Sequence, residues 1–448
     1  MADTAHPEAI DAQALEEVVR FTSELIAIDT TNRGGGDCSE RPAAEYVAEM
    51  LSDVDIDPTL LERSPGRTNV VGRIEGTDPS APALLVHGHL DVVPAEPADW
   101  SVHPFSGEVR DGVVWGRGAI DMKNMDAMVL ATVRAWARAG VRPRRDIVLA
   151  FTADEEDSAE AGSGFLAGEH AGLFEGCTEG IGESGAFTFH AGPGMRLYPI
   201  AAGERGTAWL RLTARGRAGH GSKVNRDNAV TRLAAAIARI GEHRWPMRLT
   251  PTVKAALTEL AALQGIPADP DAADFDLDGL LAKLGPAAAL VEATVRNSAN
   301  PTVLEAGYKV NVIPGSATAY VDGRMLPGGE EEFGTTLDRL TGPEVDWEFH
   351  HREVALEAPV GPGTPTYMAM RAAVEHFDPG GHVVPFCMSG GTDAKQFSRL
   401  GILGYGFSPL RLPEGFDYQA LFHGVDERVP VDALHFGVRV LDHFLRRA

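Results

Sequence analysis

An apolar run at residues 83–86 is followed closely by His89 and Asp91, two residues that metal sites use. Continuous apolar composition is typical of a strand that is covered on both faces. The two polar residues are two positions apart, so they lie on one side of the strand's carboxyl end. A metal-binding imidazole needs its second ring nitrogen held, and Asp91 is placed to hold it. The stretch predicts either the beginning of a metal site or ordinary polar capping.

A second carboxylate, Asp121, lies in a glycine-rich turn. The turn precedes a helical pattern at residues 123–139, which Gly140 ends. The fold could bring Asp121 beside His89, where two metals could share it. Capping of the helix start is the simpler interpretation of an aspartate in this position.

Two more strand ends carry glutamates. A buried strand at residues 146–152 leads directly to Glu155 and Glu156, and Glu183 follows a run of small residues. Adjacent glutamates can divide two tasks, because one can coordinate a metal while the other takes a proton from metal-bound water. A single acidic cluster of this kind could also be a solvated loop.

Length and charge restrict the protein's class. A chain of 448 residues is expected to form two or more domains. A net charge of -24 argues against a nucleic-acid partner, because phosphate contacts need a basic surface. No apolar run approaches the roughly 20 residues of a membrane span. Three cysteines without paired spacing and an N-terminus without signal-peptide features predict a cytoplasmic protein.

The order of the elements predicts two kinds of domain. Strands and helices alternate up to about residue 203, which is typical of an α/β layer domain with ligands at the carboxyl ends of its strands. An α+β pattern follows, and the α/β pattern resumes at about residue 359. The inserted part has an expected strand at residues 208–214, a helix at 228–240, an exposed acidic loop at 267–276, and a hairpin of 308–315 with 317–324.

The last part of the chain adds two candidate site elements. Residues 387–394 form a small-residue turn of the sort that exposes backbone N–H groups to an anion. His423 is a second candidate imidazole ligand. A helix expected at residues 431–445 completes the chain.

Together and in this order, these motifs resemble one family of di-zinc metallohydrolases in peptidase clan MH. The family includes aminoacylase, carboxypeptidase G, acetylornithine deacetylase and succinyl-diaminopimelate desuccinylase. The matching segments are residues 88–94, 116–123, 154–156, 182–184, 311–315 and 390–394, with His423. Each segment alone is a weak signal, but their joint order over nearly the whole chain is highly specific.

The resemblance implies an α/β metallopeptidase fold. A catalytic domain with a mixed sheet flanked by helices would be interrupted by a smaller α+β lid and dimerisation domain. Residues 1–202 and 353–448 would form the two halves of the catalytic domain, and residues 203–352 the insertion. The insertion is longer than the shortest relatives need.

The resemblance also implies a centre of two divalent metal ions. The implied ligands are His89, Asp121 and Glu183 for one ion, and Asp121, Glu156 and His423 for the other, with Asp121 bridging. Imidazole and carboxylate ligands without a thiolate suit zinc, with cobalt or manganese as replacements. Asp91 would orient His89. A metal-bridged hydroxide would attack the substrate, with Glu155 as its general base.

Further roles follow from the same resemblance. His220 would stabilise the oxyanion, in many relatives across a homodimer; a loop histidine without a role is the alternative. Arg324 and the turn of Gly390, Gly391 and Thr392 are candidates for binding a substrate carboxylate, assisted by Asn311. A structural salt bridge and an ordinary turn are the alternatives.

The predicted function is metal-dependent hydrolysis of the amide bond in an N-acyl amino acid or a small peptide with a free carboxylate. A dipeptidase or carboxypeptidase of the same mechanism is the nearest alternative. A non-catalytic binding protein that keeps the fold is the alternative from another class; such proteins usually lose ligands or the base, and here the whole set is present.

Overall fold

The structure is a computed structural model that describes residues 9–35 and 37–448. The N-terminal residues on which the cytoplasmic prediction rests lie outside this part. The chain forms two compact units. The first consists of Met1–Ala202, Ala358–Pro385 and Thr392–Ala448, and the second of Gly203–Glu357 and Phe386–Gly391. The first unit is therefore assembled from segments that precede and follow the main segment of the second unit in the sequence.

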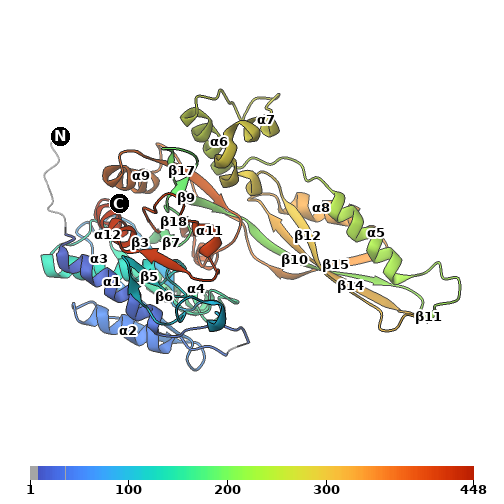
Figure 1. Cartoon of the computed structure of the whole chain (residues 1–448), viewed down its shortest axis with the longest axis horizontal. Coiled ribbons are helices and arrows are strands. Elements are labelled where there is room, and N and C mark those ends of the chain that lie inside the picture. The colour runs from blue at the N-terminus through green and yellow to red at the C-terminus, as the bar shows by residue number, and fades with distance from the viewer. Residues whose placement is uncertain (1–8, 36) are drawn as a thin grey trace. The chain divides into compact units, whose positions relative to one another are not determined.

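A mixed sheet forms the centre of the first unit (Figure 1). In sheet order its strands are β1 (Thr59–Glu62), β2 (Thr68–Ile74), β6 (Ile147–Thr152), β3 (Ala83–His89), β7 (Cys177–Gly182), β18 (Leu403–Gly406) and β9 (Arg196–Glu204). Strands β6, β3, β7 and β18 run parallel to one another. Beside β9 lie β8 (Phe189–His190), β16 (Leu356–Glu357) and β17 (Gly381–Met388).

Alternate residues of the buried strands enter two separate cores, one on each face of the sheet. Leu84 and Val86 pack into the larger core, whereas Leu85 packs into the smaller one. The larger core takes in α1 (Ala12–Ala27), α2 (Arg41–Ser52), α3 (Lys123–Ala139), α9 (Pro365–Phe377) and α12 (Val431–Leu445). The smaller core takes in α4 (Ser163–Glu169) and α10 (Ala394–Phe397). Both faces of β3 are covered, as its continuous apolar composition predicts.

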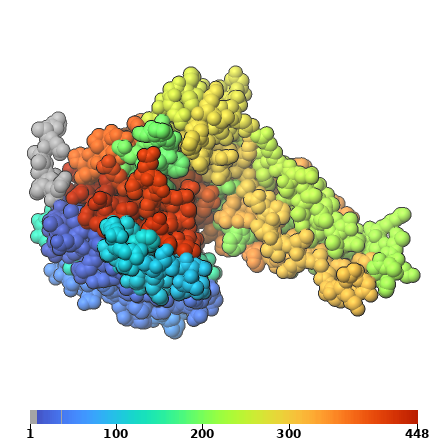
Figure 2. Space-filling model, viewed as in Figure 1, coloured from blue at the N-terminus to red at the C-terminus, as the bar shows by residue number. Residues whose placement is uncertain are grey.

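Sequence-distant ends meet in the first unit. Helix α12 packs against α1 and α3, and in Figure 2 the red C-terminal residues lie beside the blue N-terminal ones. Gly140 ends α3 in a left-handed conformation at φ 63°, as predicted from its position. A small sheet of β19 (Arg428–Pro430), β5 (Val113–Trp115) and β4 (Val109–Arg110) joins a late segment to an early one. The short helix α11 (Tyr418–Leu421) precedes β19.

The second unit is an antiparallel sheet with helices on one face. Its strand order is β12 (Ser298–Ala306), β14 (Ser316–Met325), β10 (Gly206–Arg215) and β15 (Val345–Arg352). Helices α5 (Ala229–Glu242) and α8 (Glu330–Thr341) pack on the buried face. A short ribbon pairs β11 (Gly219–His220) with β13 (Val312–Ile313). Helices α6 (Pro251–Leu263) and α7 (Leu277–Leu284) flank the exposed acidic loop.

One expected pairing is wrong. Residues 308–315 and 317–324 do not form a hairpin with each other, because β14 is paired with β12 on one edge and with β10 on the other. A strand has only two edges, so β13 pairs with β11 instead. The fold class itself, a mixed α/β sheet with helices plus a separate small antiparallel sheet, is confirmed. Among the described residues, no helix combines the length and the apolarity that crossing a membrane would require.

Candidate metal centre

Three parallel strands bring candidate ligands to one edge of the main sheet. His89 is the last residue of β3, the turn with Glu155 and Glu156 follows β6, and Glu183 follows β7. Because β3 runs parallel to both β6 and β7, the carboxyl ends of all three strands lie together. Each of these side chains therefore reaches the site because it lies at, or a few residues after, the end of its strand.

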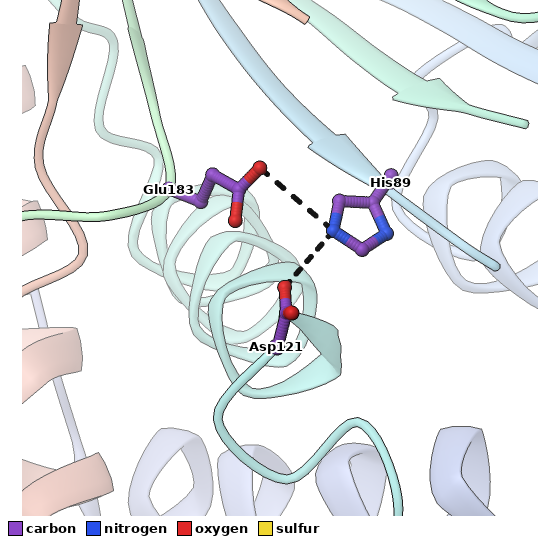
Figure 3. Close-up of side chains that lie close together, drawn as sticks. All are labelled: His89, Asp121 and Glu183. Carbon is purple, nitrogen blue, oxygen red and sulfur yellow. Dashed lines mark hydrogen bonds and ion pairs between the residues drawn. The ribbon is translucent and has the colours of Figure 1, made fainter. Parts of the chain in front are cut away.

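The first candidate group contains His89, Asp121 and Glu183, which point toward one another in Figure 3. His89 Nε2 lies 3.1 Å from Asp121 Oδ1 and 3.9 Å from Glu183 Oε1. All three residues are buried. The other ring nitrogen, Nδ1, hydrogen bonds to the backbone carbonyl of Asp91 over 2.9 Å, so Nε2 is the nitrogen that faces the two carboxylates and would coordinate a metal.

The second candidate group contains Asp121, Glu156 and His423. His423 Nε2 lies 2.9 Å from Asp121 Oδ2 and 3.3 Å from Glu156 Oε2. Asp121 thus directs one carboxylate oxygen to each histidine and belongs to both groups. A third combination joins His89 with both glutamates of the β6 turn. The site is a single cluster in which Asp121 has the central position.

Asp91 contributes differently from the expectation. Its carboxylate Oδ1 lies 3.6 Å from His89 Nδ1, and the ring donates from Nδ1 to the backbone carbonyl of Asp91 instead. The carboxylate accepts the backbone N–H groups of Glu155 and Glu156 over 3.2 and 3.1 Å. It also accepts Asn32 Nδ2 over 2.9 Å. Asp91 therefore holds the glutamate turn as well as the histidine.

A buried ion-pair network supports the same turn. Arg67 Nη2 lies 2.7 Å from Asp154 Oδ1 and 2.9 Å from Glu40 Oε1. Asp154 has a left-handed backbone at φ 67°, a conformation that non-glycine residues adopt only when neighbours compensate for its cost. The interactions with Arg67 provide that compensation and fix the residue that immediately precedes Glu155.

A second network supports Asp121 and His423. The Glu427 carboxylate accepts Arg117 Nη1 over 2.6 Å and the backbone N–H groups of Ile120 and Asp121 over 2.8 and 3.2 Å. Arg117 Nη2 also donates to the carbonyl of His423 over 3.2 Å. The turn before α3 and the loop before β19 are therefore tied to one buried ion pair.

The cluster contains more buried carboxylates than imidazoles, so added positive charge would stabilise it. Burial raises the pKa of Glu156 to about 7 and, with the charge of Asp121, raises that of Glu183 well above its usual range. Burial also raises the pKa of Glu155. Hydrogen bonds to Asp121 and Glu156 raise the pKa of His423 to about 10. These groups favour protons because four clustered carboxylates share two imidazoles, and divalent cations would satisfy the same demand.

The donor set fits divalent metals. Imidazole nitrogens and carboxylate oxygens, with no thiolate in the candidate groups, are ligands of zinc, cobalt and manganese. Glu156 Oε1 is buried and makes no hydrogen bond, which is costly for a carboxylate oxygen without a further partner. Within the described part of the chain, the predicted ligands therefore form a cluster that metal ions could complete.

The second unit contains His220, in β11, and Asn311, which immediately precedes β13. His220 in β11 pairs with Val312 in β13, and the Gly221 N–H donates to the carbonyl of Asn311 over 2.9 Å. His220 is exposed, and its Nδ1 lies 2.8 Å from Ser222 Oγ and accepts the Ser222 N–H. A ring that accepts at Nδ1 carries its proton on Nε2 when neutral.

Arg324 lies near the carboxyl end of β14, whereas the ribbon of β11 and β13 lies next to the start of that strand. Its Nε and Nη2 form an ion pair with Asp322 at 2.7 and 3.2 Å. Gly390 and Gly391 belong to the same unit, whereas Thr392 belongs to the first. Thr392 Oγ1 accepts the N–H of Ala394, as a helix-capping hydroxyl does. Arg324 and the two glycines therefore belong to one unit, where Arg205 donates to the carbonyls of Arg324 and Met388, and only Thr392 belongs to the other.

Sequence reasoning missed the residues that support the cluster. Asn32, Arg67, Arg117 and Glu427 have no metal-binding pattern of their own. Arg117 does lie within the matching segment at residues 116–123, and Glu427 follows His423 by four residues. Their closeness in sequence to predicted ligands was the available signal. That Arg117 and Glu427 pair with each other depends on the fold.

Comparisons with known proteins identify the family of the chain. Residues 85–447 match the model of peptidase family M20/M25/M40. Aminoacylase-1 of Mus musculus is 27% identical over 420 residues, covering 90% of each chain. The N-fatty-acyl-amino acid synthase/hydrolase PM20D1 of Homo sapiens is 28% identical over 397 residues, covering 84% of this chain and 76% of the relative.

Solved structures share the fold. An M20 family metallo-carboxypeptidase, Sso-CP2 from Sulfolobus solfataricus, matches with a TM-score of 0.67 and 17% identity over 96% of this chain and 99% of that one. The di-peptidase Dug1p from Saccharomyces cerevisiae matches with a TM-score of 0.66 and 17% identity over 97% of each chain. The resemblance seen in the motifs is confirmed: the chain belongs to peptidase family M20/M25/M40 and is a metallohydrolase of that family.

Proposed function

We propose that this protein hydrolyses the amide bond of an N-acyl amino acid or a small peptide that has a free carboxylate. The observation that carries the proposal is the central Asp121, whose two oxygens face His89 and His423 separately. A shared carboxylate of this kind is the arrangement that two neighbouring metals need. The names of two relatives, aminoacylase-1 and an N-fatty-acyl-amino acid hydrolase, support the substrate class.

Two divalent ions, with zinc as the first choice, would be held by the two candidate groups. When bound, they supply Lewis-acid polarisation of the carbonyl and lower the pKa of water. The ligands would be His89, Asp121 and Glu183 for one ion and Asp121, Glu156 and His423 for the other. The separations within the two groups are compatible with this division, because the ligand atoms of each group lie within 4.8 Å of one another.

Glu155 is the proposed general base. Its backbone N–H is held by Asp91, and its buried carboxyl has a raised pKa, so it is suited to accept a proton and release it again. Glu155 would take the proton from the attacking water and deliver it to the leaving amine. Glu156, adjacent to it, would stay a ligand because its side chain faces His423.

His220 is the proposed stabiliser of the oxyanion. Its Nδ1 accepts the Ser222 N–H, so Nε2 is available as a donor in the neutral ring. A preorganised donor of this kind is worth roughly 3–4 kcal/mol in the transition state. Asn311 lies beside the same ribbon and would assist in substrate binding.

Arg324 is the proposed partner of the substrate carboxylate, with the turn of Gly390, Gly391 and Thr392. Asp322 occupies its Nε and Nη2, so a substrate would bind on the Nη1 side. Arg324 and His220 are separated by most of β14, about 25 Å at 3.3 Å per residue. One small substrate cannot span that distance, so we propose a homodimer in which His220 serves the partner's centre.

A substrate panel tests the function. The protein is loaded with zinc or cobalt, its metal content is measured, and N-acetyl amino acids are compared with dipeptides. Hydrolysis of N-acyl amino acids above dipeptides supports a deacylase, and the reverse order supports a dipeptidase of the same chemistry. A protein that binds no metal and cleaves neither class would overturn the proposal in favour of a non-catalytic binding protein.

A further inference from the structure

A pocket in the first unit lies between the two segments that connect to predicted metal ligands. Its volume is about 350 Å³, within the range of small-molecule sites. It is lined by Phe187, Thr188, Phe189 and His190, and by residues 415–419. The first segment begins four residues after Glu183, and the second ends four residues before His423. The walls of the pocket and the candidate metal centre are therefore parts of the same two loops.

A series of ring contacts leads from the pocket wall to the centre. Phe187 and Tyr418 stack with centroids 4.1 Å apart and an interplanar angle of 11°. Tyr418 contacts Phe422 at 6.0 Å, and Phe422 stacks on His423 at 5.0 Å. The pKa of Tyr418 is raised by burial and by the negative charges of Asp121 and Glu183, as expected for a phenol close to the cluster.

The chemistry of the lining selects an uncharged, apolar occupant. Phe187, Phe189, Phe416 and Tyr418 supply aromatic surface, and the lining contains no lysine or arginine. Asp417 is exposed at the start of α11 and would repel a free carboxylate. His190 Nε2 is directed to the carbonyl of Leu412 over 3.1 Å. The pocket therefore does not suit the carboxylate end of the proposed substrate.

We propose that this pocket binds the acyl group of the substrate and that the acyl group is a medium or long hydrocarbon chain or an aromatic acid. The inference rests on the proposed function. The acyl carbon chain is attached directly to the carbonyl that must reach the centre, so it has to lie beside Glu183 and His423. Arg324, Asn311 and the glycine turn, the candidates for the carboxylate end, belong to the second unit.

The test changes the pocket and leaves the centre intact. Gln419→Trp replaces an exposed lining residue with a larger ring that fills the space. Glu414→Trp, an exposed position just outside the lining, is the matched control. The kcat/KM values for the N-acetyl and N-octanoyl derivatives of one amino acid are compared in the zinc-loaded wild type and both variants.

We expect the wild type and Glu414→Trp to prefer the N-octanoyl substrate by tenfold or more, because each buried methylene adds favourable transfer energy. Gln419→Trp should lose at least tenfold of this preference while its N-acetyl activity stays within about twofold. The same preference for the N-octanoyl over the N-acetyl substrate in both tryptophan variants would overturn the proposal. A change in selectivity among amino acids, with none among acyl groups, would overturn it as well.

A binding measurement separates this inference from the proposed function. Octanoate and acetate are titrated into Glu155→Gln protein and into the same protein with Gln419→Trp or Glu414→Trp added. Tighter binding of octanoate that only Gln419→Trp removes supports the pocket even if no substrate is hydrolysed. Hydrolysis of N-acyl amino acids without any difference between octanoate and acetate leaves the proposed function in place and contradicts the pocket.

Discussion

Arg117 and Glu427 form a buried ion pair, 2.6 Å between Nη1 and Oε2, that joins residues from the two sequence halves of the first unit. The pair lies behind the candidate centre, where Glu427 accepts the N–H of Asp121 and Arg117 donates to the carbonyl of His423. Two predicted ligands therefore depend on one contact. Removing one partner of a buried pair typically costs 3–5 kcal/mol, because the other charge is left without compensation.

We expect Glu427→Gln to lose metal from the group of Asp121, Glu156 and His423, because the loops that carry two of these residues are no longer held together. The shape of the side chain is kept, so no cavity is created. The measurement is the zinc content after dialysis against a weak chelator, together with the melting temperature. We predict close to one zinc per chain instead of two.

Asp442→Asn is the matched control for this variant. Asp442 is also buried and accepts Arg446 Nη2 and Trp136 Nε1, each over 2.7 Å, but it lies in α12. It should lower the melting temperature without a change in zinc content. The same zinc content in both variants would show that Glu427 only stabilises the fold.

Glu155→Gln should lower kcat by about 10²–10⁴-fold while the zinc content stays at the wild-type value, because a general base is lost and the ligands remain. Glu160→Gln, an exposed change in the same loop region, should leave both quantities unchanged. Near-normal turnover in Glu155→Gln would mean that another group accepts the proton.

Mixing two inactive variants tests whether His220 acts across a homodimer. Chains with His220→Ala and chains with Glu155→Gln should regain activity when they are unfolded and refolded together, because one of the mixed sites then has both functional residues. Up to about a quarter of the wild-type activity is expected for random pairing with equal amounts of each chain. Absence of recovery, with dimers present in solution, would place His220 at the centre of its own chain.

Because the Asp126 carboxyl is buried, we expect the free energy of unfolding to depend on pH. Burial raises the pKa of its carboxyl to about 8, against roughly 3.9 in an unfolded chain. Between these values the folded state holds a proton that the unfolded state releases, so stability falls as pH rises, by up to about 1.4 kcal/mol per pH unit. Asp126→Asn removes the dependence. Its free energy of unfolding relative to the wild type should rise steadily from pH 5 to pH 8; a constant difference would contradict the prediction.

The strands and ligand-bearing turns were predictable because their signals are local. Apolar runs predicted the buried strands β3 and β6; His89 is the last residue of β3, and Glu155 follows the end of β6 by three residues. The parallel order of β6, β3 and β7 then brings those ends together. Periodicity also gave α3 and α12 close to their observed bounds.

Pairing between distant segments was not predictable in the same way. The expected hairpin of residues 308–315 with 317–324 was wrong because β12 competes for the same edge of β14. The Asp91 carboxylate was expected on the His89 ring, yet it holds two backbone N–H groups of the glutamate turn. The pairing of a strand or a carboxylate depends on which distant segment lies beside it in the fold. The sequence pattern of one segment does not indicate which distant segment that is.

The position of β18 between β7 and β9 has a consequence for biosynthesis. A ribosome completes β7 and nearly all of β9 before it makes residues 203–357 of the second unit, and β18, His423 and Glu427 are made only after that segment. Until then the central sheet has a gap with unpaired strand edges, which are templates for association with other chains. We therefore expect the growing chain to rely on chaperones that shield β-strand edges, and we expect the proposed site of Asp121, Glu156 and His423 to form only after β18 has been made.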